Sequence, residues 1–99
     1  MSSTYIYFTR DSSFTTNEFP HSAEFHRDDG PALIRINNGK VVSEKWYHDN
    51  MLHRVDGPAV SLCNHELGIK RCAYFFNGKH YLNIQEWESE VLRQTLELL

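Results

Sequence analysis

A seven-residue motif occurs twice in this 99-residue chain, and it constrains the fold more than any other feature of the sequence. Residues 26–32, His-Arg-Asp-Asp-Gly-Pro-Ala, return 27 positions later as residues 53–59, His-Arg-Val-Asp-Gly-Pro-Ala, with six of the seven positions identical. An aromatic pair followed by a turn dipeptide recurs at residues 46–50 and 74–78. Residues 19–25 are interpreted as a degenerate first copy, which keeps only the aromatic residue and the approach to His26. The chain therefore consists of about three copies of one unit, which is typical of stacked repeat folds.

The repeated unit has the pattern of antiparallel β-structure. Residues 32–36 alternate in polarity, and residues 37–39, Asn-Asn-Gly, carry the signal of a tight hairpin turn before a return strand at residues 41–47. A second long hairpin follows at residues 59–76. The Gly-Pro of each motif interrupts the strand ladder, because proline donates no backbone hydrogen bond.

The last segment changes from a strand period to a helical one. Asn83 is a good N-cap for the apolar pattern that follows it. We expect an amphipathic helix over residues 84–97 whose apolar stripe is buried against the sheet. The side chains of that stripe include Ile84, Trp87, Val91 and Leu92.

These elements predict one mainly β (α+β) domain, a twisted antiparallel sheet of about three hairpin repeats capped by one C-terminal amphipathic helix. Residues 1–18 supply an N-terminal strand and loop, residues 19–83 the repeats, and residues 84–97 the helix. Because neighbouring residues of a strand point to opposite faces, Trp46 and Tyr47 cannot both be core. One sheet face therefore exposes aromatic rings unless the terminal segments cover it, and exposed aromatic clusters mark binding surfaces.

Composition argues against several classes of protein. Ten Lys and Arg against thirteen Asp and Glu give a net charge of −3, whereas nucleic-acid binding needs a clustered positive field. No apolar run approaches the ~18 residues that span a bilayer, and the first residues lack the pattern of a signal peptide. Cys63 and Cys72 are too few for a disulfide framework and suit a reducing compartment. We therefore expect a cytosolic protein without a membrane or nucleic-acid partner.

Six histidines raise the question of a metal site. Only Cys63 and His65 have the close spacing of structural zinc ligands, so we predict no metal and expect each motif histidine to hydrogen-bond a neighbouring turn. The Arg-x-Asp pairs, such as Arg27 with Asp29, are expected to hold the Gly-Pro turn, with a grip on a phosphate or an acidic partner as the alternative. No nucleophile signature, phosphate loop or dinucleotide motif occurs, so the sequence predicts neither an enzyme nor a bound cofactor.

The unit Trp-Tyr-x-Asn-Gly-x-x-His-Arg-x-Asp-Gly-Pro-Ala resembles the short β-hairpin repeats related to MORN repeats, which are abundant in proteins of tailed bacteriophages and large DNA viruses. The resemblance covers residues 19–92. The chain departs from the family pattern where Asp49-Asn50 replaces Asn-Gly and Tyr81-Leu82 replaces the third His-Arg. The resemblance implies a small phage protein that acts in the host cytoplasm, on a scaffold that by itself specifies no mechanism.

For such a phage protein, the resemblance implies binding rather than catalysis. We expect a protein-binding module that inhibits a host bacterial defence or regulatory protein by steric occlusion. One alternative is a sponge that sequesters a nucleotide immune signal, whose phosphates would contact Arg27, Arg54 and Arg71. Another alternative is a virion or assembly component, and formation of a homo-oligomer is left open.

The residues that break the repeat are the ones that we expect to contact the partner. Scaffold positions recur, whereas recognition residues collect on loops that a rigid sheet holds in place. The partner surface is therefore expected to combine the N-terminal segment with one edge of turns, where residues 49–51 lie with residues 65–66. The predicted partner-binding residues are Tyr7, Phe14, Tyr47, Asp49, Asn50, His65 and Glu66.

Overall fold

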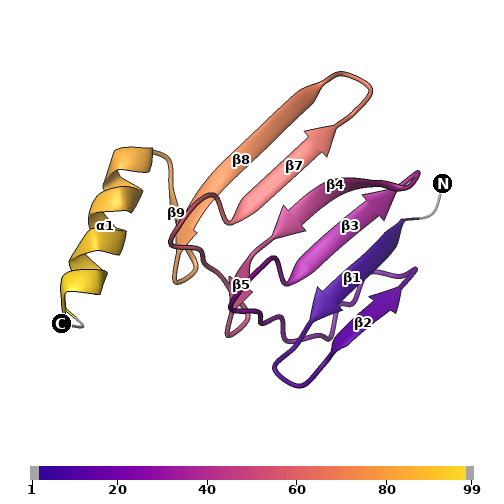
Figure 1. Ribbon diagram of the computed structural model, residues 1–99, viewed down its shortest axis with the longest axis horizontal. Coiled ribbons are helices and arrows are strands. Elements are labelled where there is room, and N and C mark those ends of the chain that lie inside the picture. The colour runs from indigo at the N-terminus through magenta and orange to yellow at the C-terminus, as the bar shows by residue number, and fades with distance from the viewer. Residues whose placement is uncertain (1–2, 98–99) are drawn as a thin grey trace.

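The computed structural model describes residues 3–97, which form one antiparallel sheet, a two-stranded ribbon and one terminal helix (Figure 1). The order of the main sheet is β2-β1-β3-β4-β7-β8-β9. Its strands are β1 (Thr4–Phe8), β2 (Ser13–Thr16), β3 (Leu33–Asn37), β4 (Lys40–Lys45), β7 (Val60–Asn64), β8 (Ile69–Phe76) and β9 (Lys79–Tyr81). The ribbon pairs β5 (Tyr47–His48) with β6 (Met51–Leu52), and helix α1 spans Ile84–Glu97. The predicted mainly β fold with one C-terminal helix is confirmed.

Three two-residue turns have both central residues in the left-handed region. They are Asn38-Gly39, Asp49-Asn50 and Asn77-Gly78, with φ between 48° and 83°. Positive φ at both positions is the requirement of the type I′ turn, whose twist matches that of paired strands. Asn, Asp and Gly tolerate this region better than other residues do. The substitution of Asp-Asn for Asn-Gly in the middle unit therefore leaves the hairpin geometry intact.

Backbone hydrogen bonds identify the equivalent residues of successive units. Phe8 and Trp46 each donate their N–H to the alanine carbonyl of the following motif, at 2.8 and 2.7 Å. Each also accepts a hydrogen bond from the N–H of the motif histidine, at 2.9 and 3.0 Å. The aromatic residue of the first unit is therefore Phe8 rather than Phe19. The first unit begins in β1, ahead of the boundary expected at residue 19.

The arginine of each motif covers this aromatic ring. Arg27 Cζ lies 4.0 Å from the ring centroid of Phe8, and Arg54 Cζ lies 3.9 Å from that of Trp46. Each guanidinium also donates through Nε to the motif aspartate and through Nη1 to the motif proline carbonyl, at 2.8–3.2 Å. A Cβ at Gly30 would lie 2.7 Å from Arg27 Cζ, so the glycine leaves the space that the guanidinium fills.

The third unit replaces this arginine with a tryptophan from α1. Tyr74 has the aromatic position, but Leu82 stands where the arginine would follow and is 94% exposed. Trp87 packs on Tyr74 instead, with 4.9 Å between the ring centroids. The Trp87 Nε1–H donates to the carbonyl of Phe75 at 3.1 Å. The helix thus closes the array by completing the stack of the last unit.

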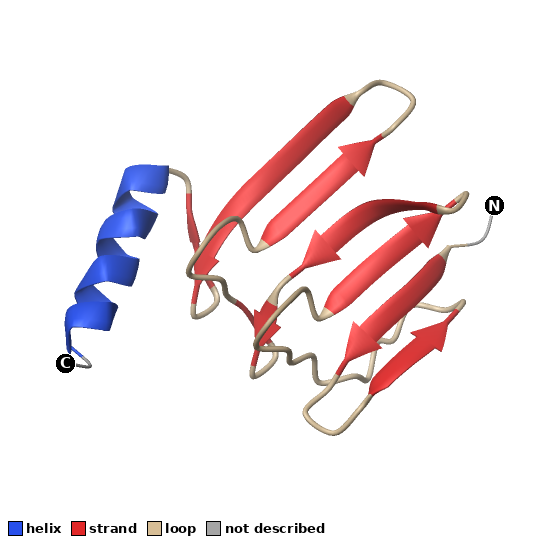
Figure 2. Ribbon diagram, viewed as in Figure 1, coloured by secondary structure: helices blue, strands red, loops and turns tan. Residues whose placement is uncertain are grey.

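Apart from this contact, α1 covers little of the sheet. It lies beside β8 and β9 at one end of the molecule (Figure 2). Trp87 is buried, but Ile84 and Leu92 are 42% and 59% exposed. The expected burial of the whole apolar stripe is therefore wrong for Ile84 and Leu92, because the helix stands at the edge of the sheet instead of lying across a face.

The core lies on one face of the N-terminal half of the sheet. Phe25, Ala32 and Leu33 are its buried residues, and Tyr7 and Tyr47 pack around them. The loop that precedes the first motif brings the Phe25 ring to 6.1 Å from the Tyr7 ring and 4.9 Å from the Tyr47 ring, between centroids. No helix of residues 3–97 covers the rest of this face, and the shortest dimension of the molecule is 18 Å.

Candidate functional site

The open part of this face forms a hollow of about 610 Å³ between the loop that carries Phe19 and the β7–β8 hairpin. Strand alternation and register explain its lining. Leu33 and Arg35 share one face of β3, Arg35 lies beside Ser43 of β4, and Ser43 lies beside Leu62 of β7. The volume lies within the range of ligand sites, about 300–1,000 Å³.

Three basic side chains line the hollow, against one acidic side chain. The basic ones are Arg35, Lys40 and Lys45, and the acidic one is Glu66. None of the three basic side chains forms an ion pair within residues 3–97, whereas the arginines of both motifs are paired with aspartates. On a chain of net charge −3, this face therefore carries a local excess of positive charge that attracts anionic groups.

The hollow is also lined by aromatic rings and by an asparagine whose buried side-chain oxygen has no hydrogen-bond partner in the described part of the chain. Tyr5 and Phe19 line it and meet edge to face, with 5.6 Å between their ring centroids. The asparagine is Asn37, and its Oδ1 is the buried atom. A buried acceptor in this state costs about 1–3 kcal/mol. The oxygen has almost no accessible surface, so a ligand in the hollow reaches it only after the Asn37 side chain shifts.

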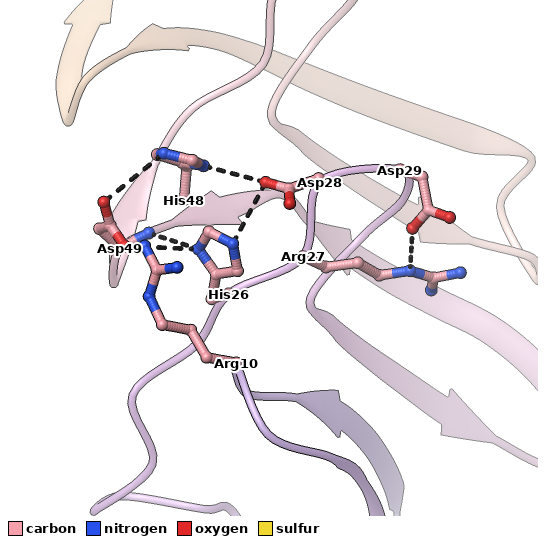
Figure 3. Close-up of polar contacts among 7 residues, drawn as sticks. All are labelled: Arg10, His26, Arg27, Asp28, Asp29, His48 and Asp49. Atoms are coloured by element: carbon pink, nitrogen blue, oxygen red, sulfur yellow. Dashed lines mark hydrogen bonds and ion pairs between the residues drawn. The ribbon is translucent and has the colours of Figure 1, made fainter.

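A second polar cluster joins the first motif to the turn of the β5–β6 ribbon (Figure 3). His26 is 8% exposed, its Nδ1 accepts the N–H of Asp49 at 3.0 Å, and its Nε2 lies 3.1 Å from Asp28. His48 lies beside His26 and has one ring nitrogen 3.3 Å from Asp28 and the other 3.5 Å from Asp49. Arg10 pairs with the carboxylate of Asp49. The cluster therefore ties three segments of the chain together.

The histidine contact recurs in the second motif, as the sequence predicts. His53 Nδ1 accepts the N–H of Asn77 at 2.9 Å, so each motif histidine holds the left-handed turn of the next unit. Acceptance at Nδ1 places the proton of the neutral ring on Nε2. Burial, and secondarily the neighbouring His48, lowers the pKa of His53 below its ordinary value of 6.5.

Metal binding is the other chemistry that such a cluster suggests, since ligand atoms of His26, His48 and Asp49 lie within 4.8 Å of one another. A histidine that binds a metal through one nitrogen normally donates N–H from the other. His26 Nδ1 accepts a hydrogen bond instead, and Arg10 already occupies the Asp49 carboxylate. A cation here would displace Arg10 and break the turn contact. The arrangement therefore fits a structural tie better than a metal centre.

Of the predicted partner-binding residues, four are divided between the core and the hollow. Tyr7 and Tyr47 pack against the core, where their rings support Phe25. His65 and Glu66 line the hollow. Phe14 is 44% exposed and stacks on Tyr7 with 5.0 Å between the ring centroids.

Asp49 and Asn50 lie at the other end of the sheet from His65 and Glu66 (Figure 1). β4 and β7 are antiparallel, so the chain that leaves β4 and the turn that follows β7 point in opposite directions. The expected single edge of turns is therefore wrong. Asn50 serves the fold, because its N–H donates to the Phe25 carbonyl at 2.8 Å and its Oδ1 accepts the Phe25 N–H at 3.0 Å.

Of the arginines predicted for an anionic ligand, Arg27 and Arg54 line one smaller hollow of about 270 Å³, and Arg71 lies elsewhere, on β8. Arg27 and Arg54 are committed to their aromatic rings and motif aspartates. Arg71 is exposed on β8 and lies opposite Leu62, which lines the hollow. Of the three, Arg71 alone lies near the basic face.

The basic side chains of the hollow were missed by sequence reasoning, which looked for function in positions that break the repeat. Arg35 and Lys45 belong to strands that the sequence identifies, and strand alternation was the signal that could have placed them. Their common face depends on the register of β3 and β4, which shifts at a bulge after Arg35. No sequence pattern indicates that bulge.

Comparison with known proteins assigns no family to the chain. No family model, curated protein or solved structure matches the chain. The similarity to MORN-related hairpin repeats therefore stays a prediction from sequence. Within residues 3–97, no helix has the length and apolar character needed to cross a bilayer.

Proposed function

We propose that this protein is a binding module whose open sheet face docks onto an acidic segment of a partner protein. The observation that carries the proposal is the hollow, in which three basic side chains without ion pairs lie around Leu62 and the Tyr5–Phe19 rings. Protein interfaces are enriched in aromatic residues and arginine, and complementary charge accelerates and orients the encounter. The partner is inhibited by occlusion, so no chemical step is required.

The resemblance to MORN-related repeats supports a phage origin for the protein and a host protein as its partner. It implies a small phage protein in the host cytoplasm, with a bacterial defence or regulatory protein as the partner. A standard interface covers about 800 Å² on each partner. The broad face of the molecule, whose two longer dimensions are 46 and 35 Å, is large enough for such an interface.

The proposal is tested by capture from the host followed by binding measurements with the purified partner. Lys40→Glu combined with Lys45→Glu reverses the charge of the hollow and is expected to weaken binding by at least about tenfold, because like charges then face each other. Lys70→Glu is the matched control. Lys70 lies opposite Cys63 on β7, one residue away from the Leu62 position that faces the hollow, so its side chain points to the other face.

Loss of binding in the double variant, with retention in Lys70→Glu, supports docking at the hollow. Equal binding by all three proteins contradicts it. Thermal melts of both variants establish that they remain folded.

A phosphorylated nucleoside is the second candidate ligand, and the hollow itself favours it over the motif arginines. Its phosphates would contact the basic side chains, and its base would lie against Tyr5 and Phe19. Mass spectrometry of the supernatant from heat-denatured protein tests this candidate. A nucleotide released from wild type and absent from Arg35→Ala supports it, and release of no nucleotide contradicts it.

A further inference from the structure

The main sheet ends in an unprotected edge at β2. Among residues 3–97, β2 pairs with β1 on one side and with no strand on the other, at the lower right in Figure 1. Natural sheets commonly protect such an edge with charged side chains, proline or a bulge, because free backbone groups there pair with another chain. The Ser-Phe-Thr-Thr sequence of β2 carries no charge and no proline, and its register with β1 is regular. The edge is therefore open to a further strand.

The hydrogen bonds of β1 show which groups of β2 point outward. Phe8 donates its N–H to the alanine carbonyl of the first motif and accepts the N–H of the motif histidine, so both of its backbone groups point away from β2. Ser13 lies opposite Phe8, and bonded and non-bonded pairs alternate along an antiparallel ladder. The N–H and C=O groups of Ser13 and Thr15 therefore face outward. Ser12 Oγ reaches the Ser13 carbonyl at 3.5 Å, at the long end of the range for a hydrogen bond.

The opposite edge of the sheet differs from β2. The three residues of β9 lie beside helix α1. Residues 69–73 of β8 pair with β7 on one side, and β9 pairs only with residues 74–76. This open stretch of β8 carries exposed Lys70 and Arg71. Pairing with the same stretch of another copy would set like charges side by side, which destabilises a strand pair.

Two copies of β2 complement each other when they run antiparallel across a two-fold axis. Ser13 of one copy then lies opposite Thr15 of the other, and the outward groups of each strand bond those of its partner. Phe14 lies opposite Phe14 of the second copy, in a non-bonded pair where side chains approach most closely. Phe14 is 44% exposed and stacks on Tyr7 with 5.0 Å between the ring centroids. The pairing extends this aromatic stack across the axis.

We propose that the protein forms a two-fold dimer through β2, in which the two sheets join into one. The same strand is used by both copies, so the contact closes at two chains. Phe14 shares its sheet face with Tyr7 and with Leu33, which lines the hollow. The hollows of both copies therefore open on the same side of the dimer. The inference goes beyond the docking function proposed above and does not depend on it.

Sedimentation equilibrium at a series of protein concentrations tests the dimer. The wild-type mass is expected to rise from the 11.6 kDa of one chain toward twice that value as the concentration approaches about 1 mM, because a contact of this size is weak. Amide hydrogen exchange at Ser13 and Thr15, measured by NMR, should slow over the same range, since their N–H groups become bonded.

Charge substitutions at the outward positions provide the decisive comparison. Ser13→Lys with Thr15→Lys places like charges opposite each other across the axis, and should hold the protein at the mass of one chain. Ser13→Glu with Thr15→Glu should do the same. An equimolar mixture of these two double variants should associate, because opposite charges then face each other, and this rescue also shows that both are folded. Cys72→Lys adds the same charge to an exposed position of β8 and should associate as wild type does.

Three results would overturn the inference. They are a wild-type mass of 11.6 kDa at every concentration, association that both double variants retain, and a wild-type mass that rises past two chains. Lys40→Glu with Lys45→Glu, which tests the docking function, should dimerise as wild type does. Loss of partner binding in that variant and loss of the dimer in the β2 variants are therefore separate results.

Discussion

Trp87 covers the ring of Tyr74 as Arg27 covers Phe8 and Arg54 covers Trp46, so a helix residue takes the place of the arginine that the third unit lacks. The two solutions fill the same space by different means. The guanidinium lies over its ring and also donates to the motif aspartate, whereas the indole packs on Tyr74 at an interplanar angle of 57° and donates once, to a backbone carbonyl. Trp87 thus covers the last unit of the array and holds α1 against it.

Truncation of the Trp87 side chain is expected to destabilise the protein strongly. Trp87→Ala removes a buried aromatic side chain and one hydrogen bond, and should lower the free energy of unfolding by about 3–5 kcal/mol. Leu92→Ala, at a position of the same helix that is 59% exposed, should change it by no more than about 0.5 kcal/mol. Urea denaturation in dilute solution measures both. Similar small losses in the two variants would show that α1 does not seal the array.

Addition of a methyl group at a motif glycine is expected to displace the arginine above it. A Cβ at Gly57 would lie 2.9 Å from Arg54 Cζ. Gly57→Ala should therefore cost about 1–2 kcal/mol in lost cation–π contact and hydrogen bonds. In an Arg54→Ala background the same change should be neutral or stabilising, because alanine restricts the unfolded chain. The double-mutant cycle compares the two, and an equal cost in both backgrounds would contradict the proposed cause.

Acid is expected to destabilise the protein through His53. Its pKa is lowered in the folded state, chiefly by burial, so the unfolded chain binds the extra proton first as pH falls below 6.5. Stability is therefore fully present above pH 6.5 and is lost as pH falls toward the lowered pKa of the folded state. Urea denaturation across this range measures the slope, and NMR titration of the His53 ring measures the pKa directly. A pKa at or above 6.5 would contradict the prediction.

The side chain of Asn50 is expected to stabilise the fold more than a glycine at the same turn position would. Asn50→Gly supplies a residue better suited to positive φ, yet it removes the oxygen that accepts the Phe25 N–H. A net loss of about 1–2 kcal/mol is expected, since an unpaired buried donor costs more than the turn gains. The equivalent change in the opposite direction, Gly78→Asn, should cost less, because asparagine tolerates the positive φ of 83° better than most residues and a Cβ there meets Met51 at 3.6 Å or more. Thermal denaturation of both variants tests this order.

The parts of the fold that follow from short stretches of sequence were predictable. The Asn38-Gly39 and Asn77-Gly78 turns, the strands beside them and the bounds of α1 rest on local signals, and the structure has them where they were expected. The equivalence of Phe8 with Trp46 was not predictable, because Phe8 is 18 residues ahead of its motif histidine and Trp46 only seven. Periodicity alone cannot align two units whose loops differ in length.

The candidate site depended on tertiary arrangement and was largely not predictable. His65 and Glu66 were identified because their loop breaks the repeat, and both line the hollow. Arg35 and Lys45 meet there only because a bulge shifts the register of β3 against β4. The exposure of Leu92 depends likewise on where α1 comes to rest. A helical pattern shows which side chains share a face, but not whether a sheet lies beneath that face.

The contacts between successive units allow the array to be lengthened by whole repeat units. The first motif binds the second unit through the same histidine and arginine contacts that the second motif makes to the third. A duplicated copy of the 27-residue unit, inserted between the first and second motifs, could form the same histidine and arginine contacts with the unit on each side of it. Phe25 would still pack at the first end of the array and Trp87 at the last. Each insertion would add two strands to the main sheet and one two-stranded ribbon, and would widen the basic face by about 10 Å. The number of middle units would therefore set the area of the sheet face that is available to a partner.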